Sequence, residues 1–176
     1  MNKDIHPQQK MDEAFDNYFE LSKILQSDMG DLLDGENESQ GWRRNFIRSS
    51  AALIEGYAHC LREVCSVSIE CVSPELSKKE IAVLNSESNC DANERFKLTI
   101  RAAYKLFELS PAPDFGGSEW RRAQQVLCKR HLLMHPKTPN NLEVPDKIWL
   151  EIREDVFWIC EQLFSFFSLV QEKYGA

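Results

Sequence analysis

Apolar residues recur every three or four positions along almost the whole chain, and this period constrains its fold more than any other feature. An α-helix turns once every 3.6 residues, so this spacing places apolar side chains on one face that a neighbouring helix can cover. No segment shows the strict alternation of apolar and polar residues that is typical of a half-buried strand. The sequence therefore predicts an all-α protein, a single-domain bundle of about five main helices.

The periodic stretches are separated by polar segments at about 34–41, 85–93, 111–118 and 136–144. We expect these segments to be loops of one domain that spans residues 1–176, with its core at about 12–174. The expected helices cover about 12–33, 41–68, 94–109, 118–132 and 145–174, with two or three further turns at 75–84.

Four residues are suited to mark where these helices begin. Proline fits the first helical position, and Asn or Ser fits the cap that precedes it. We therefore expect helices to start at Pro74 and Pro145, and Asn93 and Ser118 to cap the helices that follow them.

Composition excludes several classes of protein. The 176 residues contain no apolar run long enough to span a membrane, and the first ten residues are polar, which differs from a secretion signal. The six cysteines form no Cys-x-x-Cys pair, so we expect reduced thiols rather than disulfides or a zinc site. These features predict a cytoplasmic protein that does not insert into membranes.

Charge is unevenly distributed along the chain. The net charge of −7 argues against nonspecific nucleic-acid binding by the whole surface. Residues 118–139, however, carry five basic side chains and one acid, a local balance of +4. This basic segment favours an anionic ligand or an acidic partner surface, and a solvated helix face is the alternative explanation.

The same segment contains the only grouping with obvious chemistry: Arg130, His131 and His135. Arginine binds phosphate, and histidine titrates near neutral pH. Two histidines four positions apart also have the spacing of metal ligands, but no glutamate lies between them and no third ligand is evident, so we expect neither a metal site nor another cofactor. The alternative is structural, in which Arg130 forms a salt bridge and His131 caps carbonyl groups.

The expected helix at 41–68 carries a polar stripe formed by Arg44, Arg48, Glu55 and His59. One interpretation is an exposed face with ordinary ion pairs. In the other, Arg48 and Glu55 point toward the Arg130 segment, where they hold phosphate or orient a catalytic side chain.

An arginine, then a polar residue, then a histidine after a short interval, on a late helix of a small all-helical domain, resembles the motif of the HEPN superfamily. Arg130, His131 and His135 carry this resemblance, with four residues between the arginine and the second histidine. As a fold the resemblance extends over about 12–174, and as residues it covers this segment alone.

The resemblance implies a homodimer in which two motifs face each other, and a metal-independent endoribonuclease activity. His135 would transfer a proton at the ribose 2′-hydroxyl or the leaving 5′-oxygen, Arg130 would hold the scissile phosphate, and His131 would support them. The products would carry 2′,3′-cyclic phosphate and 5′-hydroxyl ends. The RNA would also contact a group of flanking side chains, namely Arg48, Glu55, Arg121, Arg122, Lys129 and Lys137.

Helix geometry adds a condition to this expectation. Five positions along an ideal helix place Arg130 and His135 about 140° apart. Their side chains converge only if the helix unwinds near Pro136 or if a second subunit completes the site.

Bacterial members of this superfamily serve in toxin–antitoxin or phage-defence systems, so the resemblance also implies an antitoxin or other protein partner. In some of them a tyrosine shortly after the motif is modified, but here the next tyrosine is Tyr174. Other members have lost catalysis. The alternative function is therefore a non-catalytic helical module that binds a nucleotide or an acidic protein.

Overall fold

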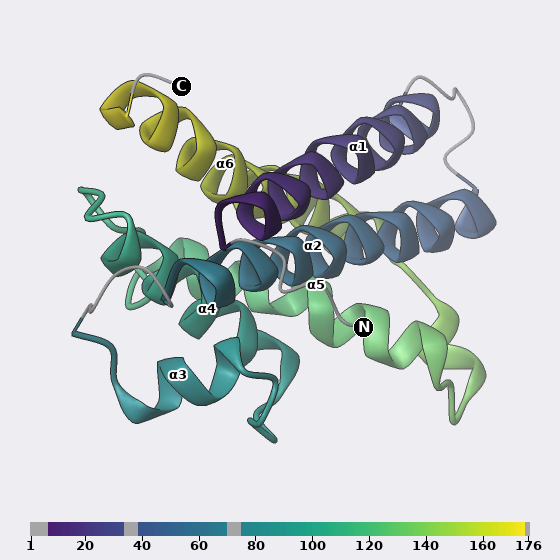
Figure 1. Ribbon diagram of the computed structural model, residues 1–176. Helices are drawn as coiled ribbons and strands as arrows, with labels where there is room; N and C mark the ends of the chain where they lie inside the picture. The colour runs from purple at the N-terminus through teal and green to yellow at the C-terminus, as the bar shows by residue number, and fades with distance from the viewer. Residues whose placement is uncertain (1–6, 34–38, 70–74, 175–176) are drawn as a thin grey trace, which may run out of the picture. The chain divides into compact units, whose positions relative to one another are not determined.

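The computed structural model describes residues 7–33, 39–69 and 75–174, and within them the chain is entirely helical apart from turns and loops, which confirms the all-α prediction. Figure 1 shows the helices in chain order. They are α1 (Pro7–Leu33), α2 (Gln40–Ile69), α3 (Lys78–Leu84), α4 (Ala92–Leu106), α5 (Ser118–Met134), the short 3-10 helix η1 (Pro139–Leu142) and α6 (Asp146–Tyr174).

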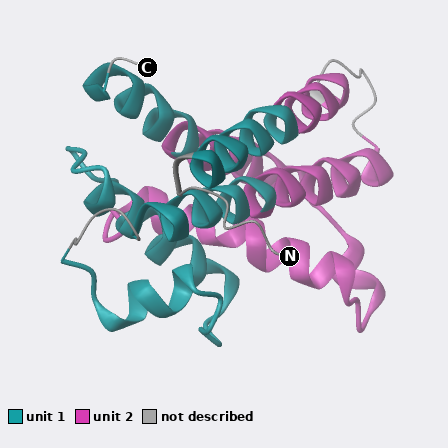
Figure 2. Ribbon diagram, viewed as in Figure 1, with its two compact units in different colours: residues 1–22, 56–113, 163–176 teal, residues 23–55, 114–162 magenta. Residues whose placement is uncertain are grey.

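The chain divides into two compact units (Figure 2). Unit 1 comprises residues 1–22, 56–113 and 163–176, and unit 2 comprises residues 23–55 and 114–162. Each of the helices α1, α2 and α6 belongs partly to unit 1 and partly to unit 2. Because these helices run from one unit into the other, the division does not test the expected single domain, which stays a prediction.

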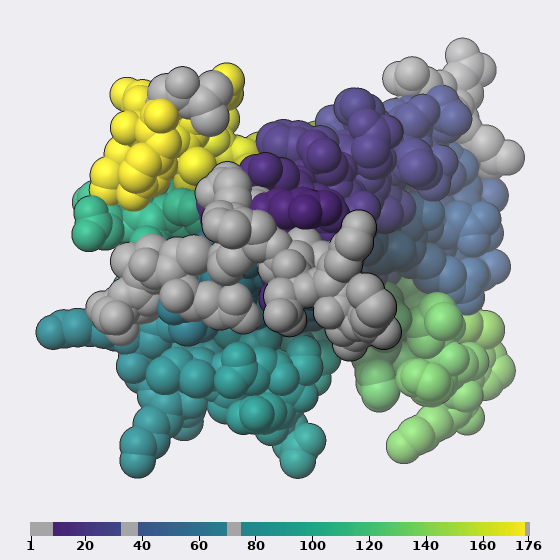
Figure 3. Space-filling view, in the orientation of Figure 1, coloured from purple at the N-terminus to yellow at the C-terminus, as the bar shows by residue number. Residues whose placement is uncertain are grey.

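The core of unit 1 is rich in aromatic rings. Tyr18 on α1 stacks on Phe167 of α6, with ring centroids 3.9 Å apart, and also contacts Tyr57 of α2 at 4.8 Å. Farther along α1 and α2, the Ser68 hydroxyl of α2 lies 3.5 Å from the sulfur of Met11 of α1. Because the residue number falls along α1 while it rises along α2, these two helices run antiparallel within unit 1. The outer side of α1 is exposed, and Figure 3 shows it in purple at the surface.

The core of unit 2 is built around Trp149 of α6, which is 1% exposed. The rings of Trp42 and Phe46, both from α2, meet it edge to face at 5.0 Å each. Aromatic pairs in this geometry stabilise a core beyond the area they bury. The first turns of α2 and α6 are therefore packed together.

The caps differ from the predicted ones. Asp91 caps α4 in place of Asn93, because its carboxylate accepts a hydrogen bond of 2.9 Å from the amide of Glu94. The cap of α5 is Gly117 in place of Ser118, which is already helical. A Cβ atom at position 117 would lie 2.8 Å from the carboxylate of Asp114, so a larger residue there would displace that side chain.

Two further boundaries are shifted. The helix predicted to reach Leu109 ends at Leu106, because Glu108 adopts a φ of 48° and Leu109 donates back to the carbonyl of Tyr104. This is the pattern of a Schellman C-cap. Pro145 lies just before α6, and its carbonyl accepts the first helical bond, from Trp149. The predicted start at Pro74 lies outside the described residues, and α3 is capped by Ser77.

Glu80 joins α3 to α4 in unit 1. Its side chain is buried and accepts hydrogen bonds from the Ser77 amide at 2.7 Å and from the Lys105 ammonium at 2.8 Å. Burial alone would raise the pKa of this carboxyl, but the hydrogen bonds and the charge of Lys105 outweigh burial and lower the pKa.

We predict that Glu80 stabilises the fold in a pH-dependent way. Because its folded pKa lies below the unfolded value of about 4.3, its contribution is complete above that value and disappears as the pH falls through the folded pKa. Glu80→Gln should lose about 1–3 kcal/mol of unfolding free energy at pH 7 and progressively less in acid. Urea unfolding at several pH values measures this, and the exposed Glu87→Gln should match the wild type throughout.

Candidate functional site

The predicted motif lies at the carboxyl end of α5, within unit 2. The helix ends at Met134, and His135 leaves it with φ −129° and ψ 58° while its amide still donates to the carbonyl of His131. The following Pro136 disfavours helical geometry at His135. The helix therefore continues two residues beyond its predicted end at about 132, and His135 lies at its exit.

Arg130 is oriented by a carboxylate of α2. Its Nη2 atom lies 3.1 Å from Oε2 of Glu55. The two side chains are 32% and 41% exposed, so water screens the pair and its contribution to stability is small, about 1 kcal/mol or less. What this pair provides is a fixed direction for the guanidinium group at the surface.

The two histidines form a pair beside this arginine. The ring centroids of His131 and His135 are 5.1 Å apart with the rings tilted by 52°, and both residues are exposed. The intervening Leu133 is buried, whereas Leu132 and Met134 are 41% and 48% exposed. The last turn of α5 therefore presents imidazole and apolar groups together to solvent.

Arg48 holds the end of α5. Its Nη2 atom donates to the carbonyl of Leu133 at 3.3 Å, and its Nη1 atom donates to the Asn45 side chain. The last four carbonyls of a helix have no partner within the helix, and a cation is favoured there by the helix dipole. Arg44, one turn earlier on α2, donates in the same way to the carbonyl of Leu142 at 3.1 Å.

Lys129 fastens the loop that follows α5. Its ammonium group donates to the carbonyls of Glu143 at 2.6 Å and Asn141 at 3.3 Å. Burial lowers the pKa of this lysine, and the nearby Glu143 carboxylate offsets part of that effect. The Asn141 side chain in turn accepts from the amides of Lys137 and Thr138.

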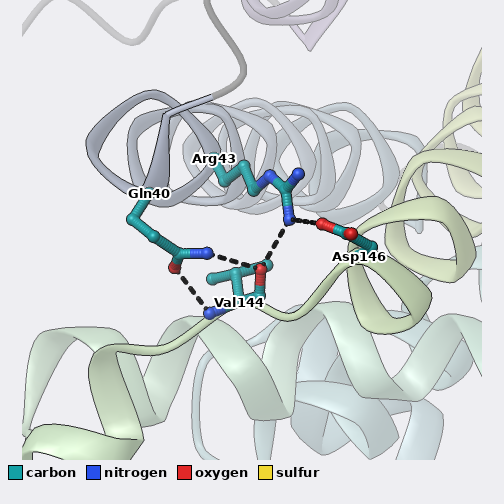
Figure 4. A network of polar contacts seen from close by, with 4 residues as sticks. All are labelled: Gln40, Arg43, Val144 and Asp146. Atoms are coloured by element: carbon teal, nitrogen blue, oxygen red, sulfur yellow. Dashed lines mark hydrogen bonds and ion pairs between the residues drawn. The ribbon is translucent and has the colours of Figure 1, made fainter.

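A polar network at the start of α2 secures the far end of the same loop (Figure 4). Gln40 exchanges two hydrogen bonds with the backbone of Val144, at 2.8 and 2.9 Å. The buried Arg43 donates to the Val144 carbonyl at 2.9 Å and pairs with Asp146 at 2.7 Å. Its guanidinium also lies 5.9 Å from the ring centroid of Trp149. Sequence reasoning missed this network, because no periodic signal connects residues more than 100 positions apart.

The other side chains predicted to contact RNA lie in different surroundings within unit 2. Arg122 pairs with Asp155 of α6 at 3.2 Å. Burial raises the pKa of Asp155, and Arg122 counteracts that rise. Arg121 is exposed, and its Nε atom donates to the carbonyl of Gly117 at 3.4 Å. Lys137 is exposed on the loop after α5.

Of the predicted site residues, the structure places Arg130, His131, His135, Arg48 and Glu55 around one helix end. The four others, Arg121, Arg122, Lys129 and Lys137, lie along α5 or its loop, and the side chains of the first three donate hydrogen bonds to protein groups. No cluster of three or more His, Cys, Asp or Glu side chains that could hold a metal ion occurs in the described part of the chain. No helix among the same residues has both the length and the apolar character needed to cross a membrane.

Comparisons with models of protein families, with curated proteins and with solved structures found no match. The motif and the geometry of this helix end are therefore the features that bear on function.

We predict that Arg43 is a principal anchor of the loop and of the α6 start. Arg43→Met keeps the length of the side chain but removes two charge-assisted hydrogen bonds, which should lower the unfolding free energy by about 2–4 kcal/mol. Urea unfolding provides the measurement. Arg121→Met, at an exposed position of α5, is the matched control and should change stability by about 0.5 kcal/mol or less. Equal losses in both variants would contradict the assignment.

Proposed function

We propose that this protein is an endoribonuclease of HEPN type that cleaves RNA by attack of the 2′-hydroxyl without a metal cofactor. The observation that carries the proposal is the exposed end of α5. There Arg130, oriented by Glu55, directly precedes His131 in the sequence, and His131 pairs with His135. A phosphate-binding cation and two imidazoles are the groups that this chemistry requires.

Arg130 would bind the phosphodiester and stabilise the charge that develops on it. A guanidinium presents a planar fork of N–H donors that matches two phosphate oxygens. Glu55 would act as a positioning residue, since its contact at 3.1 Å directs the guanidinium without enclosing it. Fixed donors aimed at developing charge are among the largest contributions to catalysis.

The histidines would move the protons. One imidazole takes the proton of the 2′-hydroxyl as the 2′-oxygen attacks phosphorus, and the 5′-oxygen leaves with a proton from a protonated imidazole. The bond formed is 2′-O–P and the bond broken is P–O5′, so the products are a 2′,3′-cyclic phosphate and a 5′-hydroxyl with no water consumed. His135, at the unwound end of the helix, is the first candidate for these transfers, and His131 supports it.

A homodimer would supply two such helix ends to one cleft. The α5 end is exposed, and its apolar Leu132 and Met134 flank the imidazoles. A two-fold axis beside α5 would bring Arg130 of one copy toward His135 of the other. An RNase of this kind in the cytoplasm needs restraint, which is consistent with a toxin or phage-defence role and an antitoxin or other protein partner.

We predict that purified protein cleaves mixed RNA in excess chelator and leaves 2′,3′-cyclic phosphate ends. Arg130→Ala and His135→Ala should each reduce the rate by about 10²–10⁴, the usual effect of removing an acid, base or charge-stabilising group. Arg101→Ala, which removes an exposed arginine of α4 outside the predicted site, should retain activity. End-group analysis of the fragments provides the readout, and identical background cleavage by all variants would remove the enzyme proposal.

We also predict complementation between two inactive variants. If each site takes its arginine from one copy and its histidine from the other, mixing Arg130→Ala with His135→Ala should regenerate one intact site per mixed dimer. Activity should then recover to about a quarter of the wild-type rate, since half of randomly formed dimers are mixed. No recovery, with mixed dimers demonstrated by differential tagging, would mean that each site is built within one chain.

A second candidate is supported by one observation: Arg48 and Lys129 already donate to the protein's own carbonyls. These two cations near the motif therefore hold the end of α5 and the loop that follows it. A non-catalytic module would use the remaining exposed cations to bind a nucleotide or an acidic protein. This candidate would be selected if the protein bound RNA or a nucleotide but did not cleave RNA in the assay above.

A further inference from the structure

A groove in unit 1 lies between α1 and α2, away from the motif residues in the sequence. Its volume is about 510 Å³, within the usual range for small-ligand sites. The lining residues are Lys10, Glu13, Ala14, Asn17 and Leu21 of α1 and His59, Cys60, Glu63 and Val67 of α2. His59 belongs to the polar stripe identified from the sequence, and the proposed ribonuclease function does not use it.

The floor of the groove is apolar. Ala14 and Cys60 are 9% and 7% exposed, and Leu21 and Val67 are half-buried beside them. Burial raises the pKa of the Cys60 thiol, and the carboxylate of Glu63 adds to the effect. The thiol is therefore neutral at physiological pH and acts as part of the apolar floor.

The rim carries charges of both signs. Glu13 accepts a hydrogen bond from Gln9. Within the part of the chain that the structure describes, the side chains of Lys10, Asn17, His59 and Glu63 make neither hydrogen bonds nor ion pairs. A concave apolar floor with uncommitted groups of opposite charge at its edge is suited to a ligand that is itself zwitterionic and partly apolar.

The helices set the spacing of these charges. Met11, next to Lys10, lies level with Ser68 of α2. Glu63 precedes Ser68 by five residues, which is a distance of about 7.5 Å along the helix axis. An extended peptide advances about 3.3–3.6 Å per residue, so the two ends of a chain of two or three residues are separated by a similar distance.

We propose that this groove binds a short peptide of two or three residues by its free ends, with the carboxylate at Lys10, the ammonium at Glu63 and apolar side chains on the floor. Asn17 offers a donor and an acceptor to the peptide group between them. A nucleotide is disfavoured, because two carboxylates and one ammonium give the lining a negative balance at neutral pH.

The test is calorimetric titration of the full-length protein with L-leucyl-L-leucine, its N-acetyl derivative and its C-terminal amide. The dipeptide should bind with a Kd of about 0.1–1 mM, as expected for a ligand of this size. Blocking either end should weaken binding about tenfold. The proposal would be overturned if none of the three ligands gave binding heat at about 10 mM, or if all three bound with equal affinity.

Two variants assign the ends of the ligand. Glu63→Gln should abolish the preference for the free amine over the N-acetyl form and keep the preference for the free carboxylate. Lys10→Met should do the reverse. Both positions are exposed, so the fold should be retained, and the exposed Lys79→Met and Glu87→Gln serve as matched controls with wild-type binding. An unchanged ligand preference in both groove variants would refute the assignment. Because the readout is peptide binding, its failure leaves the ribonuclease proposal untouched.

Discussion

The need to satisfy buried backbone polar groups governs unit 2. The loop between α5 and α6 passes close to α2, and Val144 within it is completely buried. A buried carbonyl without a hydrogen bond costs on the order of 1–3 kcal/mol. Long polar side chains donate hydrogen bonds to the carbonyls of four residues of this loop, and these side chains belong to Gln40, Arg43, Arg44 and Lys129. They satisfy backbone groups that strand pairing would satisfy in a sheet.

The same side chains determine where the motif lies. Arg48 caps α5 at Leu133, and this contact sets the orientation of the turn that carries the histidines. Glu55, seven residues farther along α2, reaches Arg130 from the same helix. Two contacts that orient the helix end and the guanidinium group of Arg130 therefore come from α2.

How much of this arrangement could be predicted depended on the range of the interactions. The long helices follow from a local period, and the helix exit at His135 follows from the proline after it. The placement of Glu55 near Arg130 was one of two interpretations of a polar stripe, because a stripe shows which residues share a face but not what that face meets. Asp91 and Asn93 both have a side-chain oxygen that can cap α4, and local sequence does not decide between them. Arg43 and Val144, and the groove beside His59, required knowledge of which helices pair.

The ion pair of Arg130 has one further consequence. A guanidinium has five N–H donors, and the described residues engage it through Nη2 alone. Its two-pronged edges are Nε with Nη2 and Nη1 with Nη2, and Nη2 carries two hydrogens, so the contact with Glu55 leaves both N–H donors of one edge unused. An anion with two oxygen atoms on one tetrahedral or planar centre can therefore dock on this arginine without displacing Glu55, and the carboxylate and the anion would then share one cation.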